Sequence, residues 1–182
     1  MKTVLSHVHR LGQRYAQRAF FEFLRDAAVA PLHRLAFLPA IAPYVIGLDD
    51  LYRHVLRCEP AADGLQRMVN DHVRAAQQAA AIAAYRADVA ALGQPLPIAS
   101  EPALQDGGDE ATTASRLLAL RLAHLGWAAG PAQRLALIAC IEAADDALFG
   151  LTQPLATAHR RRSGEDLHFC AGNHRPDPKG EA

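Results

Sequence analysis

The sequence predicts an all-α protein, and three observations support this prediction. Apolar residues recur at three- and four-residue steps along most of the chain. No stretch alternates polar and apolar residues as a half-buried strand does. The 182 residues are 51% hydrophobic, which is enough for one domain with a substantial core. We expect residues 1–158 to form a single helical-bundle domain and residues 159–182 to form a partly flexible C-terminal tail.

Two helical patterns open the chain. The first covers residues 3–28 and leaves room for one break. The second runs from Pro31, which suits the first position of a helix, until Pro60 stops it. Because proline removes a backbone donor and crowds the preceding turn, we expect Pro39 and Pro43 to kink the second helix.

Residues 68–92 are the stretch around which we expect the bundle to be built. They contain no Gly or Pro over about seven helical turns, and Ala, the best helix former, dominates their C-terminal half. Because Ala has little bulk, neighbouring helices can approach this one on more than one side. The pattern predicts one central helix that ends at Gly93.

The second half of the chain predicts a loop and then two more helices. Residues 94–108, rich in Pro, Gly and Asp, indicate a surface loop. The next helix is expected to end at Gly126. Its cap is one of three hydroxyl residues: Thr112, Thr113 or Ser115.

Pro131 is expected to open the last helix, which should end near Thr152 because Pro154 follows. A short basic cluster at residues 160–162 then follows. We interpret it as favourable charge near the end of a helix rather than as a nucleic-acid patch.

Charge and cysteine content limit the partners and the compartment. Nineteen basic and nineteen acidic residues balance, so no net field attracts nucleic acid or an anionic membrane. The N-terminal residues lack the apolar core of a secretion signal, and no run reaches the roughly 18 apolar residues of a membrane helix. Cys58 and Cys140 lie in helical patterns, as buried thiols of cytosolic proteins do. We expect a cytoplasmic protein without nucleic-acid or membrane partners.

The polar residues of the central helix form a pattern that begins with Asn-Asp-His at residues 70–72 and ends with Asp88 and the Leu-Gly pair at residues 92–93. It resembles a helix of the iron-containing redox enzymes with a haem-oxygenase-like fold, which are related to di-iron oxidases of that fold. In that family a Glu, an Asp, a second His and a Trp follow the first His. His72 matches the first His, and the other four positions hold alanines: Ala75, Ala76, Ala79 and Ala80.

Further stretches resemble the same family. Residues 37–51 are similar to its apolar, Pro-containing second helix. Glu142 matches the second Glu of a Glu-x-x-Glu motif, whose first position holds Ala139. His174 matches the first His of a Tyr-Phe-Gly-x-His-His segment. The resemblance covers roughly residues 20–175 and implies a haem-oxygenase-like helical bundle in which the metal-ligand motif is degenerate.

The resemblance implies an iron site that would draw on His72, Glu142 and His174. Asp145 can add a carboxylate, because it lies three residues after Glu142 and therefore on the same helix face. Carboxylates and imidazoles hold iron in such oxidases and leave positions open for dioxygen. Alternatively, Glu142 and Asp145 belong to a solvated acidic helix face. These four residues are the candidate metal ligands, and we assign no catalytic or cofactor-binding residue.

Two other groups of side chains carry donor atoms. Asp50 and His54, four residues apart, can share a metal or form a local hydrogen bond. His168, Cys170 and His174 offer zinc donors but lack a second pair that would complete a tetrahedron. Phosphate-binding Gly-rich loops, nucleophile elbows and zinc-protease helices are absent from the sequence.

Three hypotheses about function follow. Because Ala has no donor atom, the first is a member without the family's iron chemistry, which binds a small molecule in the bundle cavity or a protein partner on an exposed helix face. This hypothesis requires no cofactor. The second is an oxidoreductase that binds non-haem iron through an unconventional ligand set. The third is a purely structural bundle that forms a homodimer.

Two structural expectations test the resemblance. The first is that His72 is at least partly buried and hydrogen-bonded to another helix. The second concerns the alanines. Compared with the Glu, His and Trp of the family motif, they remove on the order of 200 Å³ of side-chain volume, and a void of that size in a packed interior lowers stability. Either the helices move inward, or a cavity bordered by His72, Glu142 and Arg116 remains. We expect closure, since Ala lets helix backbones approach each other.

Overall fold

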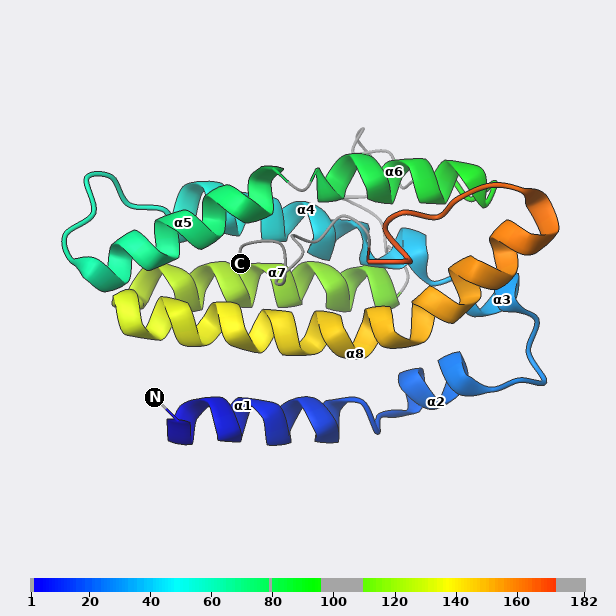
Figure 1. The fold of residues 1–182 in the computed structure, drawn as a ribbon, viewed down its shortest axis with the longest axis horizontal. Helices are drawn as coiled ribbons and strands as arrows, with labels where there is room; N and C mark the ends of the chain where they lie inside the picture. The colour runs from blue at the N-terminus through cyan, green and yellow to red at the C-terminus, as the bar shows by residue number, and fades with distance from the viewer. Residues whose placement is uncertain (1, 79, 96–109, 173–182) are drawn as a thin grey trace, which may run out of the picture.

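The computed structural model describes residues 2–78, 80–95 and 110–172. Helices are the only regular secondary structure in these ranges, so the predicted all-α class is confirmed. The helices lie roughly along one direction, with α5 and α6 on one side, α4, α7 and α8 below them, and α1 and α2 along the outer side of α8 (Figure 1). The elements in chain order are α1 (Lys2–Tyr15), α2 (Ala19–Arg25), α3 (Pro31–Arg34), η1 (Leu38–Ile41), α4 (Ala42–Asp50), η2 (Leu51–Leu56), α5 (Gly64–Gln78), α6 (Ala81–Ala91), α7 (Glu110–Ala128) and α8 (Pro131–Ser163).

The first predicted helix contains the one break that its pattern allowed, between Tyr15 and Ala19. α1 packs along α8, where Gly12 faces Ala143 so closely that an added Cβ at Gly12 would lie 3.5 Å from the Ala143 Cβ. Phe21 and Leu24 of α2 are almost fully buried in the core.

The second predicted helix is divided into α3, η1, α4 and η2, and its prolines lie where these elements begin. Pro31 starts α3, Pro39 lies in the first turn of η1, and Pro43 lies in the first turn of α4, so the predicted kinks are confirmed. Among the described residues, this stretch, Pro31–Leu56, is long and apolar enough to cross a membrane by length and composition alone. Core helices of soluble proteins and signal sequences meet the same criteria, and 28% of the apolar window is buried here.

The prediction of one central helix over residues 68–92 is wrong. α5 ends at Gln78, α6 begins at Ala81, and Ala80 between them has a φ of +50°, in the left-handed region that L-residues rarely adopt. The two halves have different neighbours: α5 packs on α8 and η2, whereas α6 packs on α4. Tertiary contacts therefore override the helix propensity of the alanines. The predicted end is confirmed, because α6 stops at Ala91 and Gly93 follows with a φ of +64°.

The start of α7 differs from its prediction. The helix begins at Glu110, so Thr112, Thr113 and Ser115 lie inside it and none of them caps it. Ser115 is buried, and its hydroxyl accepts a hydrogen bond of 3.1 Å from the backbone N–H of Tyr44. The predicted loop before α7 lies almost entirely outside the described residues.

The end of α7 also differs, since the helix continues two residues past Gly126 to Ala128. Gly126 is needed for packing rather than for ending the helix, because an added Cβ there would lie 3.0 Å from the Leu51 Cδ1 atom.

α8 begins at Pro131 as predicted, but the expected end near Thr152 is wrong. The helix continues through Pro154 to Ser163 and bends in its C-terminal part (Figure 1). Proline at an internal position removes one hydrogen bond and kinks a helix without always ending it. Residues 160–162 lie in the last turn of α8, where positive charge suits the helix dipole as predicted.

Residues 164–172 return from the end of α8 and pack against the core. Leu167, Phe169 and Cys170 are buried. The Thr152 hydroxyl donates a hydrogen bond of 2.7 Å to the Cys170 carbonyl, and the Cys170 N–H donates one of 2.8 Å to the Asp88 carboxylate. The first part of the expected tail, residues 159–172, thus completes α8 and this returning segment, and residues 173–182 lie outside the described ranges.

Candidate functional site: a cleft lined by alanine, aromatic and acidic residues

A cleft of about 1480 Å³ lies between α4 with η2, α5 with α6, and α8. α5 supplies Ala75 and Ala76, and the junction with α6 supplies Ala80 and Ala81. The returning segment supplies Phe169 at one end. The expectation that the helices close over the alanines is therefore wrong, and Arg116, which we expected at the border of a preserved cavity, does not line it.

The cleft stays open because α5 is held by contacts on another side. Val69 and Val73 of α5 are fully buried in a cluster with Leu51 of η2 and Ile141 of α8. These contacts fix the distance between α5 and α8, while α6 follows α4 beyond the break at Ala80. The alanines therefore face space rather than another helix backbone.

His72 and Glu142, two of the predicted metal ligands, face each other across the cleft. The His72 Nε2 atom lies 3.5 Å from the Glu142 Oε1 atom, with 33% and 45% of the respective side chains exposed. The prediction that His72 is partly buried is confirmed. Its contact with α8 is an ion pair only when the imidazole is protonated, and 3.5 Å is longer than a normal hydrogen bond, so the predicted hydrogen bond to another helix is not confirmed.

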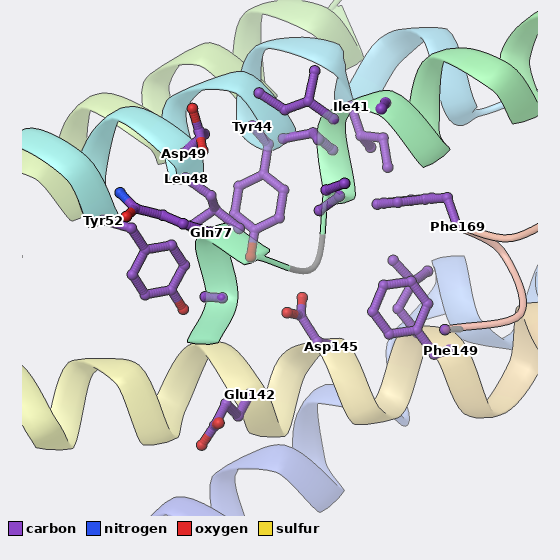
Figure 2. Close-up of a pocket in the computed structure, with 18 of the residues that line it drawn as sticks. Ile41, Tyr44, Leu48, Asp49, Tyr52, Gln77, Glu142, Asp145, Phe149 and Phe169 are labelled. Carbon is purple, nitrogen blue, oxygen red and sulfur yellow. The ribbon is translucent and has the colours of Figure 1, made fainter. Parts of the chain in front are cut away.

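Asp145 lines the same cleft one helical turn after Glu142. Figure 2 shows its carboxylate directed from α8 towards the ring of Tyr44, with Tyr52 on one side and Phe149 on the other. Burial, and then the negative charge of Asp145, raise the pKa of the Tyr44 hydroxyl well above its usual value. Burial and the same carboxylate also raise the pKa of Tyr15.

An ion pair lies at the polar end of the cleft, which is the end away from Phe149 and Phe169. The Arg53 Nε atom lies 2.7 Å from the Asp49 carboxylate, one turn away on the same helical stretch. Gln77 of α5 lies at the same end in Figure 2, and Arg86 of α6 and Asp146 of α8 also line the cleft.

The described residues bring together three of the four predicted metal ligands in one cleft, but they do not form a complete iron site. His72 and Glu142 are within 3.5 Å of each other, and Asp145 lies nearby on the same face of α8. In the described part of the chain, no three His, Cys, Asp or Glu side chains are grouped closely enough to hold a metal ion. His174 lies outside the described residues.

The other predicted donors lie away from the cleft. Asp50 and His54 are exposed and do not line it. His168 is exposed, whereas Cys170 is buried two residues later, so the structure places them in different environments. Burial, and then the nearby Asp88, raise the pKa of the Cys170 thiol, so this thiol is not a reactive one.

Sequence reasoning missed the aromatic lining of the cleft: Tyr44, Tyr52, Phe149 and Phe169. A signal was present in α8, because Glu142, Asp145 and Phe149 follow each other at steps of three and four and must share a face. Tyr44 and Tyr52, eight residues apart, share a face of the second helical stretch in the same way.

Comparison with known proteins gave no family model and no characterised protein that matches this chain. The fold and the cleft therefore define its class: an all-α protein with a large cleft that is part aromatic, part acidic.

Proposed function

We propose that this chain is a haem-oxygenase-like bundle that binds a small molecule in the cleft between α4, α5, α6 and α8. The cleft itself carries the proposal. Ligand pockets are typically about 300–1,000 Å³, apolar or aromatic over most of their surface, with a few polar groups that orient the ligand. A volume of about 1480 Å³ is large enough for such a ligand.

The His72–Glu142 contact supports the haem-oxygenase-like assignment. The resemblance aligned these two residues separately, on two different helices, as ligands of one metal. In the structure they approach to 3.5 Å. An accidental alignment would not be expected to bring them together.

The alanines support binding without the family's iron chemistry. Ala75 and Ala76 line the cleft where the family motif supplies a Glu and an Asp, and Ala has no donor atom. Ala80 lines it where the motif has a Trp. Their small side chains leave room that an organic ligand can fill.

Binding can be tested with prodan, a neutral fluorophore whose emission shifts to the blue in an apolar site. We expect saturable binding by the purified chain. Ala76→Phe, which puts a ring into the cleft, should weaken binding at least about tenfold, a change of about 1.4 kcal/mol. Ala87→Phe is the matched control, because Ala87 is exposed on α6 and outside the cleft.

Two results would contradict the proposal. One is equal binding by the two variants, which would place the probe elsewhere on the protein. The other is no saturable binding by the unchanged chain. Far-ultraviolet circular dichroism of both variants establishes that the substituted proteins are folded.

The second candidate function is an oxidoreductase that binds non-haem iron. The approach of His72 to Glu142, with Asp145 on the same face of α8, is the observation that favours it. Under our proposal, anaerobic titration with ferrous iron yields less than one tightly bound iron per chain. One iron per chain that is lost in Glu142→Gln, but kept in the exposed-site control His54→Ala, would instead favour the iron-binding oxidoreductase.

A further inference from the structure

Among the described residues, the charged side chains that line the cleft are unequal in sign. Four of them are carboxylates and two are guanidiniums, which leaves two excess negative charges when His72 is neutral. The carboxylates are those of Asp49, Glu142, Asp145 and Asp146, and the guanidiniums are those of Arg53 and Arg86. The whole chain has a formal net charge of zero, so this excess is a property of the cleft.

The α8 side of the cleft supplies three of these carboxylates, those of Glu142, Asp145 and Asp146. Asp49 lies 2.7 Å from Arg53, so these two charges largely offset each other. Asp145 is half-buried, and its charge contributes to the raised pKa values of Tyr44 and Tyr15. A cation near Asp145 would therefore be attracted in surroundings where solvent screening is reduced.

Aromatic rings lie beside the same carboxylate. Figure 2 shows Asp145 between Tyr52 and Phe149 and directed towards Tyr44. Ring faces attract a cation within about 6 Å of their centroids, most strongly where water is excluded. A carboxylate among aromatic rings is suited to an ammonium group.

The two ends of the cleft differ in polarity. Tyr52, Asp49 and Gln77 lie towards one end in Figure 2, and Phe149 and Phe169 lie towards the other. The two phenylalanine rings pack edge to face with their centroids 5.4 Å apart, and they form an apolar wall at their end. A ligand with a charged head and an apolar body fits this polarity.

We propose that the ligand is an organic cation, a protonated or quaternary amine with an apolar or aromatic body. Its head lies beside Asp145 and the rings of Tyr44 and Tyr52, and its body lies along Phe149 and Phe169. This inference rests on the proposed function, since it names the ligand class of the same cleft. An anionic ligand of similar shape would be repelled by the carboxylates of the cleft.

Three probes that share one body test the inference: phenylbutylamine, phenylbutanol and phenylbutyrate. Isothermal titration calorimetry near neutral pH compares a cation, a neutral molecule and an anion in one site. We expect the amine to bind about tenfold more tightly than the alcohol, from the charge and ring contacts together, and the acid to bind most weakly. Either equal affinities for all three probes or a preference for the acid would overturn the inference.

Asp145→Asn assigns the preference to one carboxylate. The variant should lose about tenfold in affinity for the amine and keep its affinity for the alcohol, which also shows that it is folded. Asp71→Asn is the matched control, because Asp71 is exposed on α5 and does not line the cleft. An Asp145→Asn protein that keeps the full amine preference would contradict the assignment.

The alcohol separates a failure of this inference from a failure of the proposed function. If phenylbutanol binds and Ala76→Phe weakens it, the cleft is a ligand site, whatever the preference among head groups. If neither the alcohol nor the amine binds the unchanged chain, both proposals fail.

Discussion

The α4–α7 contact and the α5–α6 side of the cleft are both built from small residues, but only the first is closely packed. An added Cβ at Gly47 of α4 would lie 2.5 Å from the Ala119 Cβ of α7, so these two helix backbones are nearly in contact. Ala75 and Ala76 of α5 instead face a cleft of about 1480 Å³. Small residues permit close approach but do not cause it. They bring helices together where small residues on both helices face each other and no neighbouring contact holds them apart.

The largest expected effect comes from adding one methyl group at the α4–α7 contact, and its counterpart is one methyl group added at the α8 wall of the cleft. Gly47→Ala should lower the free energy of unfolding by about 2 kcal/mol, because Ala119 cannot move without shifting α7. Gly150→Ala should raise it by about 0.5–1 kcal/mol, since Gly150 lies within α8, lines the cleft and has no atom within 4 Å of an added Cβ. Urea unfolding measures both.

Equal effects in Gly47→Ala and Gly150→Ala would remove the distinction between the two regions. A destabilised Gly150→Ala protein would mean that the cleft is closed in solution near that residue.

Tyr44 belongs to both regions, because its backbone N–H is hydrogen-bonded to Ser115 of α7 and its ring lines the cleft. Its pKa is raised in the folded state, so the folded protein holds this proton more tightly than the unfolded chain does. The contribution of this hydroxyl to the free energy of unfolding is fully present below the usual tyrosine pKa and is lost as the pH rises above it. About half a unit above pH 10, the free energy of unfolding should have fallen by about 0.8 kcal/mol through this group.

The measurement compares urea unfolding of the unchanged protein and Tyr44→Phe at neutral and alkaline pH. The difference in stability between the two proteins should shift in favour of Tyr44→Phe as the pH rises. If the difference is the same at every pH, the hydroxyl is solvated and this part of the cleft is not dry.

The smallest expected effect tests the break between α5 and α6. Ala80→Gly should raise the free energy of unfolding by about 0.5 kcal/mol, because relief of a left-handed φ slightly exceeds the entropy cost of glycine. If α5 and α6 were one continuous helix in solution, the same change would instead cost about 1 kcal/mol. The sign of the change, measured by thermal or urea unfolding, decides between the two arrangements.

The sequence predicted the helices better than it predicted what lies between them. Pro31, Pro131 and Gly93 act locally, through a fixed φ or a left-handed turn, and their positions at helix ends are confirmed. The break at Ala80 and the passage of α8 through Pro154 are decided by packing against other elements, which local patterns do not contain.

For the site, the sequence predicted residues but not their surroundings. His72, Glu142 and Asp145 do line one cleft. The expectation that the cleft closes failed because the buried contacts of Val69 and Val73 hold α5 in place, and these contacts depend on the distance between helices. The contribution of Tyr44 and Phe149 was missed because an apolar face in a sequence does not distinguish a packed core from the wall of a cavity.

The returning segment at residues 164–172 has a consequence for how this sequence can diverge. Asp88 and Thr152 hold the backbone N–H and carbonyl of Cys170, and neither bond uses the thiol. Other small residues at the buried position 170 can therefore keep the segment in place, whereas a change at Asp88 or Thr152 leaves a buried backbone group without its partner. Distant relatives in which position 170 has changed should still have both an acidic residue at position 88 and a hydroxyl residue at position 152.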